Sequence, residues 1–291
     1  MCDETTESEN HAYLTRRRFA AAGASAMAAV ALPGCASATE PGERAGAALA
    51  ERRVSIKTRD GKADGFFVHP AKGRHPAVLM WPDIAGLRDA YKTLGRRLAQ
   101  AGYAVLVVNH YYRSAPAPIV SEMAEWRTPA GQAKIGPMRA PLTPEAIARD
   151  AVAFVAWLDG QKEVDTARGI GTKGYCMTGP YTIRAAAAVP QRIKAAASFH
   201  GGGHVTGDAD SPHLLIPRTQ AGYVFAIAQN DDAREPETKD VLRQTCKDSG
   251  RPADIEVFPA QHGWCTPDAP VYDPAQQARA WDKMLAMFNR L

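Results

Sequence analysis

The sequence has few cysteines, little excess charge and few long apolar runs, and each shortage excludes a class of protein. Its five cysteines form no C-x-x-C pair or other metal-ligand spacing, so we expect neither a bound metal nor a cofactor. A net charge of +4 over 291 residues argues against a nucleic-acid partner and is compatible with small anionic substrates. Beyond the N-terminal segment, no apolar run is long enough to span a bilayer. With 45% hydrophobic residues, the chain can instead build one large domain with a sizeable core.

The N-terminal segment resembles an export signal. Three arginines, Arg16–Arg18, precede Phe19 and a run of small and apolar residues, Ala20–Leu32. Paired arginines before a modestly hydrophobic stretch are typical of twin-arginine signals. We therefore expect residues 1–38 to lie outside the folded domain and the protein to work in the periplasm or cell envelope.

Two processing sites compete at the end of this segment. Residues 36–38, Ala-Ser-Ala, fit an A-x-A cleavage site, whereas residues 32–35 resemble a lipoprotein box with Cys35 as a lipid anchor. Residues 39–291 then form a single domain. Because an exported chain meets an oxidising compartment, a disulfide between Cys246 and Cys265 stays open as an alternative to two free thiols.

Apolar strands and helical periods alternate along this domain. An opening hairpin is expected from residues 53–57 and 65–68 around a turn at Asp60-Gly61. Further strands are predicted at residues 76–81, 104–108, 169–175, 193–199, 223–228 and 255–258. Helices are predicted at residues 91–101, 143–158, 178–189, 235–249 and 275–291. This alternation indicates an α/β fold with a mostly parallel central sheet and helices on both faces.

Residues 114–142 interrupt the alternation. They contain five prolines and no convincing apolar period. A loop of this length in a compact domain is usually functional, so we expect a lid or binding segment here.

Cys176 lies in a segment that resembles a nucleophile elbow. Residues 169–180 read as a short strand, a tight turn with Cys176 at its tip, and the start of a helix. Gly174 lacks the Cβ that would keep strand and helix apart. The positive end of the helix dipole and a neighbouring imidazole would make the thiol reactive. The alternative is a buried structural cysteine, because free cysteines are often buried.

Candidate partners of Cys176 follow two later strands. Asp231 and Asp232 follow the strand at 223–228, and His262 follows the strand at 255–258. A lone histidine in a loop is often structural, and nothing local separates the two aspartates. The order nucleophile, acid, histidine is nevertheless that of α/β-hydrolases, in which the histidine takes the nucleophile's proton and the acid orients it.

Two backbone N–H groups are candidates for an oxyanion hole. One belongs to Met177, directly after the cysteine, and the other to Ile84, in the loop after the first core strand. Donors at these positions would stabilise the negative charge that develops on the substrate oxygen.

Two histidines four residues apart, His200 and His204, also follow a strand. Glycines separate them, which argues against a helix that would align both rings on one metal ion.

Several segments together resemble the dienelactone hydrolase family of α/β-hydrolases, over most of the chain from about Val54 to the last helix. The matching segments are Pro76–Met80, Gly86–Arg88, Asn109–Arg113, Gly174–Met177, Ser198–Gly202, Asn230–Asp231 and His262–Trp264. The resemblance implies a Cys–Asp–His triad with Cys176 as nucleophile and Asp231 as acid. It also implies hydrolysis of a lactone or carboxylic ester through a thioester acyl-enzyme.

The same resemblance implies substrate-binding residues. Arg113 matches an arginine thought to hold the substrate carboxylate, Asp83 stands where the family often has a glutamate that holds the resting thiol, and Trp264 follows the histidine. Besides Asp83, two further departures from the family pattern stand out. Thr178 replaces a glycine of the elbow, and a second arginine expected after the histidine is replaced near Thr266. The alternatives are a catalytically inactive member that binds an envelope metabolite and an esterase with another acyl substrate.

Overall fold

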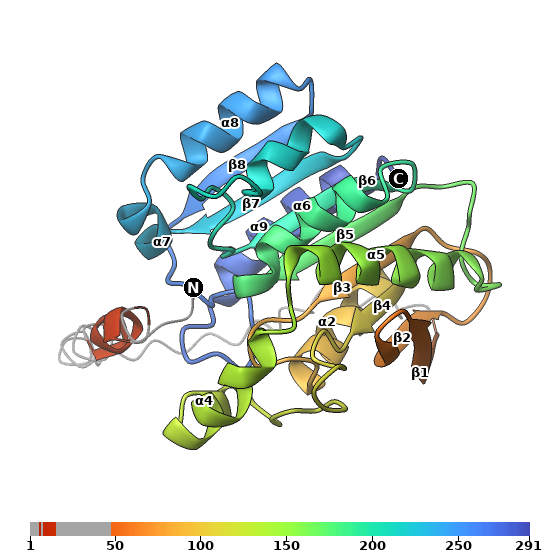
Figure 1. The fold of residues 1–291 in the computed structure, drawn as a ribbon, viewed down its shortest axis with the longest axis horizontal. Coiled ribbons are helices and arrows are strands. Elements are labelled where there is room, and N and C mark those ends of the chain that lie inside the picture. The colour runs from red at the N-terminus through yellow and green to blue at the C-terminus, as the bar shows by residue number, and fades with distance from the viewer. Residues whose placement is uncertain (1–5, 7, 16–47) are drawn as a thin grey trace, which may run out of the picture.

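The computed structural model describes residues 6, 8–15 and 48–291, and the last range folds around one eight-stranded sheet (Figure 1). The three arginines of the expected export signal, both processing sites and Cys35 lie outside the described residues. The strands are β1 (Leu49–Thr58), β2 (Gly61–Pro70), β3 (Ala77–Trp81), β4 (Ala104–Val108), β5 (Ile170–Tyr175), β6 (Ile193–Phe199), β7 (Gly222–Ala228) and β8 (Ala253–Phe258).

The sheet has the order β1-β2-β4-β3-β5-β6-β7-β8. Strand β2 is antiparallel to β1 and to β4, and all the remaining pairs are parallel. The predicted mostly parallel sheet and its opening hairpin are therefore confirmed. Parallel strands end at one edge, so the loops after β3, β5, β6, β7 and β8 meet there.

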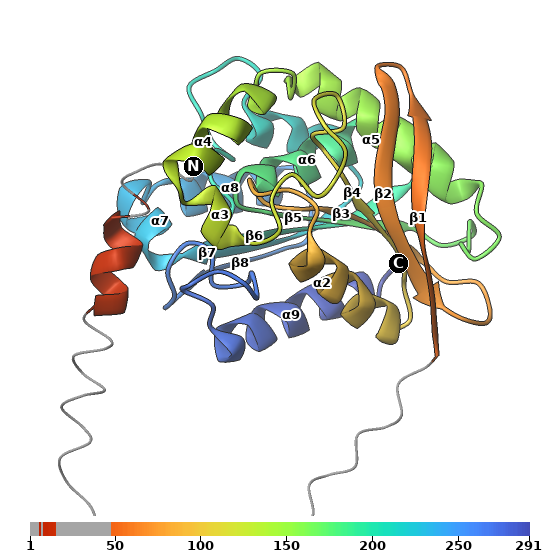
Figure 2. The same ribbon diagram turned by 90° about the horizontal axis from the view of Figure 1, so that it is seen from below.

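Helices cover both faces of the sheet (Figure 2). Helices α5, α6 and α8 pack on one face, and α2 and α9 pack on the other. The longer helices are α2 (Asp89–Gln100), α5 (Pro144–Asp159), α6 (Gly179–Ala188), α8 (Thr238–Asp248) and α9 (Pro274–Phe288). The short ones are α3 (Met123–Trp126), α4 (Pro129–Ile135), α7 (Gln229–Arg234) and the 3-10 helices η1 (Gly136–Arg139), η2 (Cys176–Thr178) and η3 (Pro212–Arg218).

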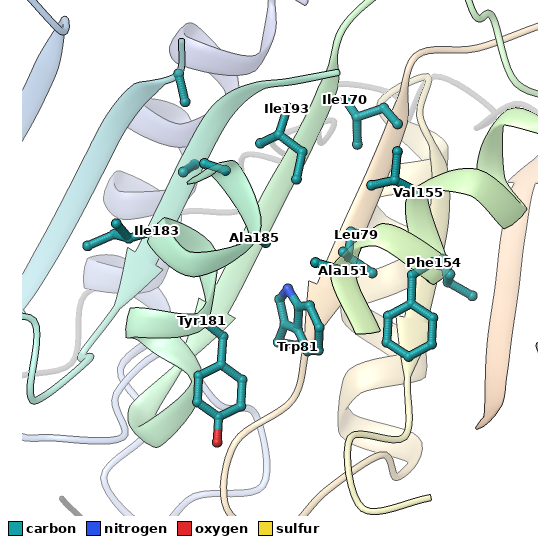
Figure 3. Close-up of a cluster of buried hydrophobic side chains, with 14 of the residues drawn as sticks. Leu79, Trp81, Ala151, Phe154, Val155, Ile170, Tyr181, Ile183, Ala185 and Ile193 are labelled. Atoms are coloured by element: carbon teal, nitrogen blue, oxygen red, sulfur yellow. The ribbon is translucent and has the colours of Figure 1, made fainter. Parts of the chain in front are cut away.

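Each face of the sheet carries its own apolar core. Figure 3 shows the first, in which Trp81 of β3 lies between Phe154 of α5 and Tyr181 of α6. Cys246 belongs to this core, whereas Cys265 belongs to the core on the opposite face. Both thiols are buried. Because the sheet lies between them, they do not form a disulfide with each other and both are free.

Residues 114–142 contain more structure than their sequence suggests. Helices α3, α4 and η1 lie within them, and Thr128 caps α4 by accepting a hydrogen bond from the Gly131 N–H at 3.0 Å. Helices of four to seven residues are too short to display an apolar period, which explains why the sequence predicted only a loop.

A further difference lies after β7. The sequence predicted one helix from residue 235, but the chain forms the six-residue α7 first and begins α8 only at Thr238. Pro236 lies between the two helices and cannot continue the hydrogen-bonding pattern of the first.

Candidate active site

Cys176 lies on a strained turn between β5 and α6. Its φ angle is +55°, a left-handed conformation that is uncommon for a residue with a side chain. A Cβ on Gly174 would stand 2.2 Å from the Thr178 carbonyl oxygen, so the predicted close approach of strand and helix is confirmed. The turn therefore requires glycine at position 174.

Thr178, the departure from the usual glycine, stabilises this turn. Its hydroxyl accepts a hydrogen bond from the Tyr175 N–H at 2.9 Å. The same hydroxyl lies 2.9 Å from the carbonyl oxygens of Trp81 and Tyr175, to which it can donate. The side chain thus links the elbow to the end of β3 rather than obstructing the packing.

The structure brings Cys176, His262 and Asp231 together. The Nδ1 atom of His262 lies 2.7 Å from Oδ2 of Asp231, which leaves Nε2 for the thiol. The thiol of Cys176 is hydrogen-bonded to the imidazole. All three residues lie shortly after the carboxyl ends of strands, namely β5, β7 and β8, with Cys176 at the start of η2 and Asp231 in α7. Asp232 instead pairs with Lys239 at 2.6 Å, so the geometry selects Asp231.

Electrostatics favour a charged histidine in this group. Burial disfavours the imidazolium, but the carboxylate of Asp231 and the negative charge of the Cys176 thiolate raise the pKa of His262 to about 10. Burial also opposes ionisation of Asp231, yet His262 and Arg234 hold the pKa of that carboxyl below its ordinary value. The arrangement is suited to a thiolate–imidazolium pair.

Two residues that the sequence did not single out orient this group. Asn230 accepts a hydrogen bond from the His262 backbone N–H at 2.8 Å, and Arg234 donates to Oδ1 of Asp231. Both belong to α7. The i,i+3 spacing of Asp231 and Arg234 would have indicated their pairing only if the helix had been expected there.

The two residues expected to form an oxyanion hole are linked by one tyrosine. The Tyr111 hydroxyl donates to the Ile84 carbonyl oxygen at 2.9 Å and lies 3.6 Å from the Met177 sulfur. Ile84, Tyr111 and Cys176 share one apolar cluster. The loop after β3 therefore packs directly against the elbow, as two converging N–H donors require.

A narrow cavity of about 30 Å³, partly open to solvent, lies over the thiol. Cys176, His262 and Asp83 line it, and so do Met123 and Trp126 of the segment expected to be a lid. That volume holds only about one or two water molecules.

Asp83 faces this cavity, but its oxygens already accept hydrogen bonds. Arg88 binds both of them, at 2.7 and 3.0 Å, and the Ala85 N–H donates to Oδ1 at 3.0 Å. The buried guanidinium of Arg88 also binds Asp268 at 2.7 and 2.8 Å, and Asp268 accepts from the Met123 N–H. Asp83 is thus part of a buried ionic network that fastens the lid segment.

Two further expected substrate-binding residues lie elsewhere. Arg113 does not line the cavity, because its guanidinium binds Asp60 at 2.6 Å and Asp150 at 2.7 Å. Trp264 is fully buried, with its ring stacked on Phe258. Neither side chain is placed to touch a substrate in this cavity.

The two histidines after β6 have different surroundings. His204 is hydrogen-bonded to the Ser198 hydroxyl at 2.9 Å. His200, at a φ of +40°, packs edge-on against the His262 ring, and both its ring nitrogens lack a partner among the described residues. Within the described ranges, no group of three or more His, Cys, Asp or Glu residues is arranged to hold a metal ion.

A nucleophile elbow after one strand, followed along the chain by an acid and a histidine on later strands, defines an α/β-hydrolase. The chain matches the dienelactone hydrolase family over residues 63–291 and belongs to that family.

Individual relatives agree with this assignment. A protein of Methylorubrum extorquens, provisionally named a carboxymethylenebutenolidase, is 26% identical over 249 residues, which cover 81% of this chain and 80% of the relative. A Klebsiella pneumoniae structure provisionally named a dienelactone hydrolase has a TM-score of 0.71 at 22% identity, covering 84% of this chain and all of that one. A dienelactone hydrolase-like promiscuous phosphotriesterase from metagenomic libraries has a TM-score of 0.65 at 24% identity, covering 84% and 99%. The family and its named members identify the chain as a carboxylic ester hydrolase.

Proposed function

We propose that the protein is a cysteine hydrolase that cleaves a lactone or carboxylic ester through a thioester acyl-enzyme. The observation that carries the proposal is the connected series of contacts from Cys176 through His262 to Asp231 at the base of a cavity. A thiol on a strained elbow, beside an imidazole that a carboxylate orients, is an activated nucleophile.

The first half of the reaction starts from the thiolate–imidazolium pair, in which Nε2 of His262 holds the thiol proton, and the sulfur attacks the ester carbonyl carbon. The carbonyl π electrons move onto oxygen, where the N–H groups of Met177 and Ile84 would stabilise the charge. When the carbonyl reforms, the C–O bond breaks and the leaving oxygen takes the proton from His262. In a lactone that oxygen stays attached to the acyl group.

In the second half, His262 accepts a proton from water and the resulting hydroxide attacks the thioester carbon. The C–S bond then breaks, a carboxylic acid is released, and the thiolate is left beside the protonated His262, which restores the starting pair. Asp231 stays ionised throughout and stabilises the imidazolium in both steps.

Replacing the nucleophile tests this proposal. We expect Cys176→Ala to lower kcat for an activated ester such as 4-nitrophenyl acetate by at least about 10³-fold, because no acyl-enzyme can form. Cys246→Ala is the matched control, because it removes another buried free thiol and should retain activity. Mass spectrometry of the wild type during turnover should show the acylated cysteine. Wild-type rates from a folded Cys176→Ala protein would refute the cysteine mechanism.

An esterase with a neutral acyl substrate is the second candidate, and the position of Arg113 favours it. The guanidinium expected to hold a substrate carboxylate is engaged by Asp60 and Asp150. Met123, Trp126 and Val271 give the cavity apolar walls, beside the charged Asp83 and Arg127. Comparing kcat/KM for a dienelactone with that for uncharged esters of similar size separates the two substrates. If no ester is cleaved and Cys176 is alkylated no faster than an ordinary thiol, the protein is an inactive, ligand-binding member.

We also propose that residues 1–38 direct export through the twin-arginine route, on the basis of the arginines before an apolar run. None of the helices described is both long and apolar enough to cross a membrane. Fusing residues 1–38 to a reporter that is active only outside the cytoplasm tests the proposal. Replacing the second and third arginines by lysine should abolish export, and unchanged export would contradict this route.

A further inference from the structure

We propose that the chain's own residues 6 and 8–15 are the natural occupant of a surface at the mouth of the cavity and cover the active site until residues 1–38 are removed. The surface consists of Asn230, Arg234 and the backbone carbonyl of His262. This inference rests on the proposed function, because it concerns access to the same thiol. Figure 2 shows the helix of residues 8–15 beside α7.

Asn230 contacts the catalytic group with one end of its side chain and the N-terminal segment with the other. Its Oδ1 accepts from the His262 N–H at 2.8 Å, and its Nδ2 donates to the Glu9 carboxylate at 3.0 Å.

Arg234 bridges in the same way. One nitrogen of its guanidinium binds Asp231, and another donates to the Thr6 hydroxyl at 2.7 Å. Glu9 lies 3.8 Å from the same guanidinium. The side chains that orient the acid and the histidine therefore each also donate to the segment.

The segment also closes the cavity itself. Thr6 and Asn10 line it together with Cys176, and the two residues are 1% and 4% exposed. Asn10 donates to the His262 carbonyl oxygen at 3.1 Å, and Leu14 packs on the apolar cluster that contains Cys176. Burial of two polar residues with specific partners distinguishes this contact from a segment lying loosely on the surface.

The covering residues lie within the stretch expected to be cleaved after export. If residues 1–38 are removed, the donors of Asn230 and Arg234 face solvent and the cavity opens. A hydrolase covered in this way would be inactive before processing and active afterwards. The surface that is exposed carries donors suited to an anionic or carbonyl group of the substrate.

The test uses the full chain with a site-specific protease recognition sequence inserted after Ala38. The alkylation rate of Cys176 with iodoacetamide and the hydrolysis of 4-nitrophenyl acetate are measured before cleavage, and again after cleavage and removal of the peptide. We expect both rates to rise at least about tenfold, because a covered site is available only in the fraction of molecules that open. Equal rates before and after cleavage would overturn the cover.

The two readouts separate this inference from the proposed function. Faster alkylation without any hydrolysis supports the cover and refutes the hydrolase. Hydrolysis at an unchanged rate supports the hydrolase and refutes the cover.

Point variants in the uncleaved chain provide a second test. Glu9→Ala and Asn10→Ala each remove a contact with the surface and should raise the alkylation rate towards that of the cleaved protein. His11→Ala is the matched control, because this side chain of the same helix is exposed. If all three variants alkylate at the wild-type rate, the contacts do not restrict access to the thiol and the proposal fails.

Discussion

At the scale of single residues, Lys173 shows how the sheet tolerates an unusual side chain. It is fully buried in β5, and its Nζ has no hydrogen-bond acceptor among the described residues. The rings of Tyr175, Phe199 and Trp281 surround it, with centroids 4.6 to 4.9 Å from Nζ. Burial lowers the pKa of Lys173 to about 7 even so. Aromatic faces attract a cation but replace only part of its hydration.

This lowered pKa predicts a pH-dependent stability. Between pH 7 and about 10 the unfolded chain holds a proton on Lys173 that the folded protein has released, so the free energy of unfolding rises with pH in this window. Below pH 7 both states carry the proton and the cost of burying the charge is fully present.

Lys173→Met should abolish that rise. Urea unfolding from pH 6.5 to 9.5 should show the stability advantage of the variant over the wild type shrinking as pH increases. Lys62→Met, at an exposed position of β2, controls for the loss of a lysine as such. A constant difference between wild type and Lys173→Met over this range would mean that the buried amine does not titrate there.

At the scale of elements, the nucleophile elbow is the segment in which packing restricts the choice of residue most. Gly174 and Thr178 act together, because the carbonyl of residue 178 occupies the space a Cβ at 174 would need. The elbow could be predicted from the spacing of glycines around Cys176. The hydrogen bonds of Thr178 to Trp81 and Tyr175 could not, since they depend on where β3 ends relative to β5.

Gly174→Ala should therefore destabilise the protein and displace the thiol. Because the added methyl group meets backbone rather than a movable side chain, we expect a loss of at least about 2 kcal/mol in unfolding free energy, as in other overpacked sites. Gly136→Ala is the matched control, since a Cβ there has no neighbour within 4 Å. Chemical denaturation of both variants measures the effect, and equal stabilities would show that the elbow can relax.

At the scale of the whole molecule, Arg113 joins distant parts of the chain rather than binding substrate. Its guanidinium connects Asp60 in the turn of the β1–β2 hairpin to the buried Asp150 of α5. The family resemblance led us to expect that Arg113, which follows β4, would face the cavity and bind the substrate carboxylate. Its ion pairs with Asp60 and Asp150 hold it away from the cavity instead. Both partners are remote in sequence, so the residues around Arg113 do not predict these contacts.

Arg113→Gln should consequently reduce stability and leave substrate binding intact. Loss of the guanidinium leaves Asp150 buried without its cation, which typically costs about 3 kcal/mol. KM for an anionic lactone should stay within about twofold of the wild type. Arg149→Gln is the control, because this more exposed arginine also pairs with Asp60 and should matter little. A raised KM with unchanged stability would restore Arg113 as a substrate ligand.

The sequence by itself determined the alternation of strands and helices, the elbow around Cys176 and the order of the three candidate catalytic residues, because apolar periods and glycine positions are local properties. Tertiary structure decided what depends on distance in space. It selected Asp231 over Asp232, engaged Asp83 and Arg113 in ion pairs, and placed Met123 and Trp126 of α3, together with Thr6 and Asn10, at the cavity. Each of these contacts joins residues that are far apart in the sequence. They come together only when the sheet has folded, so local sequence patterns do not predict them.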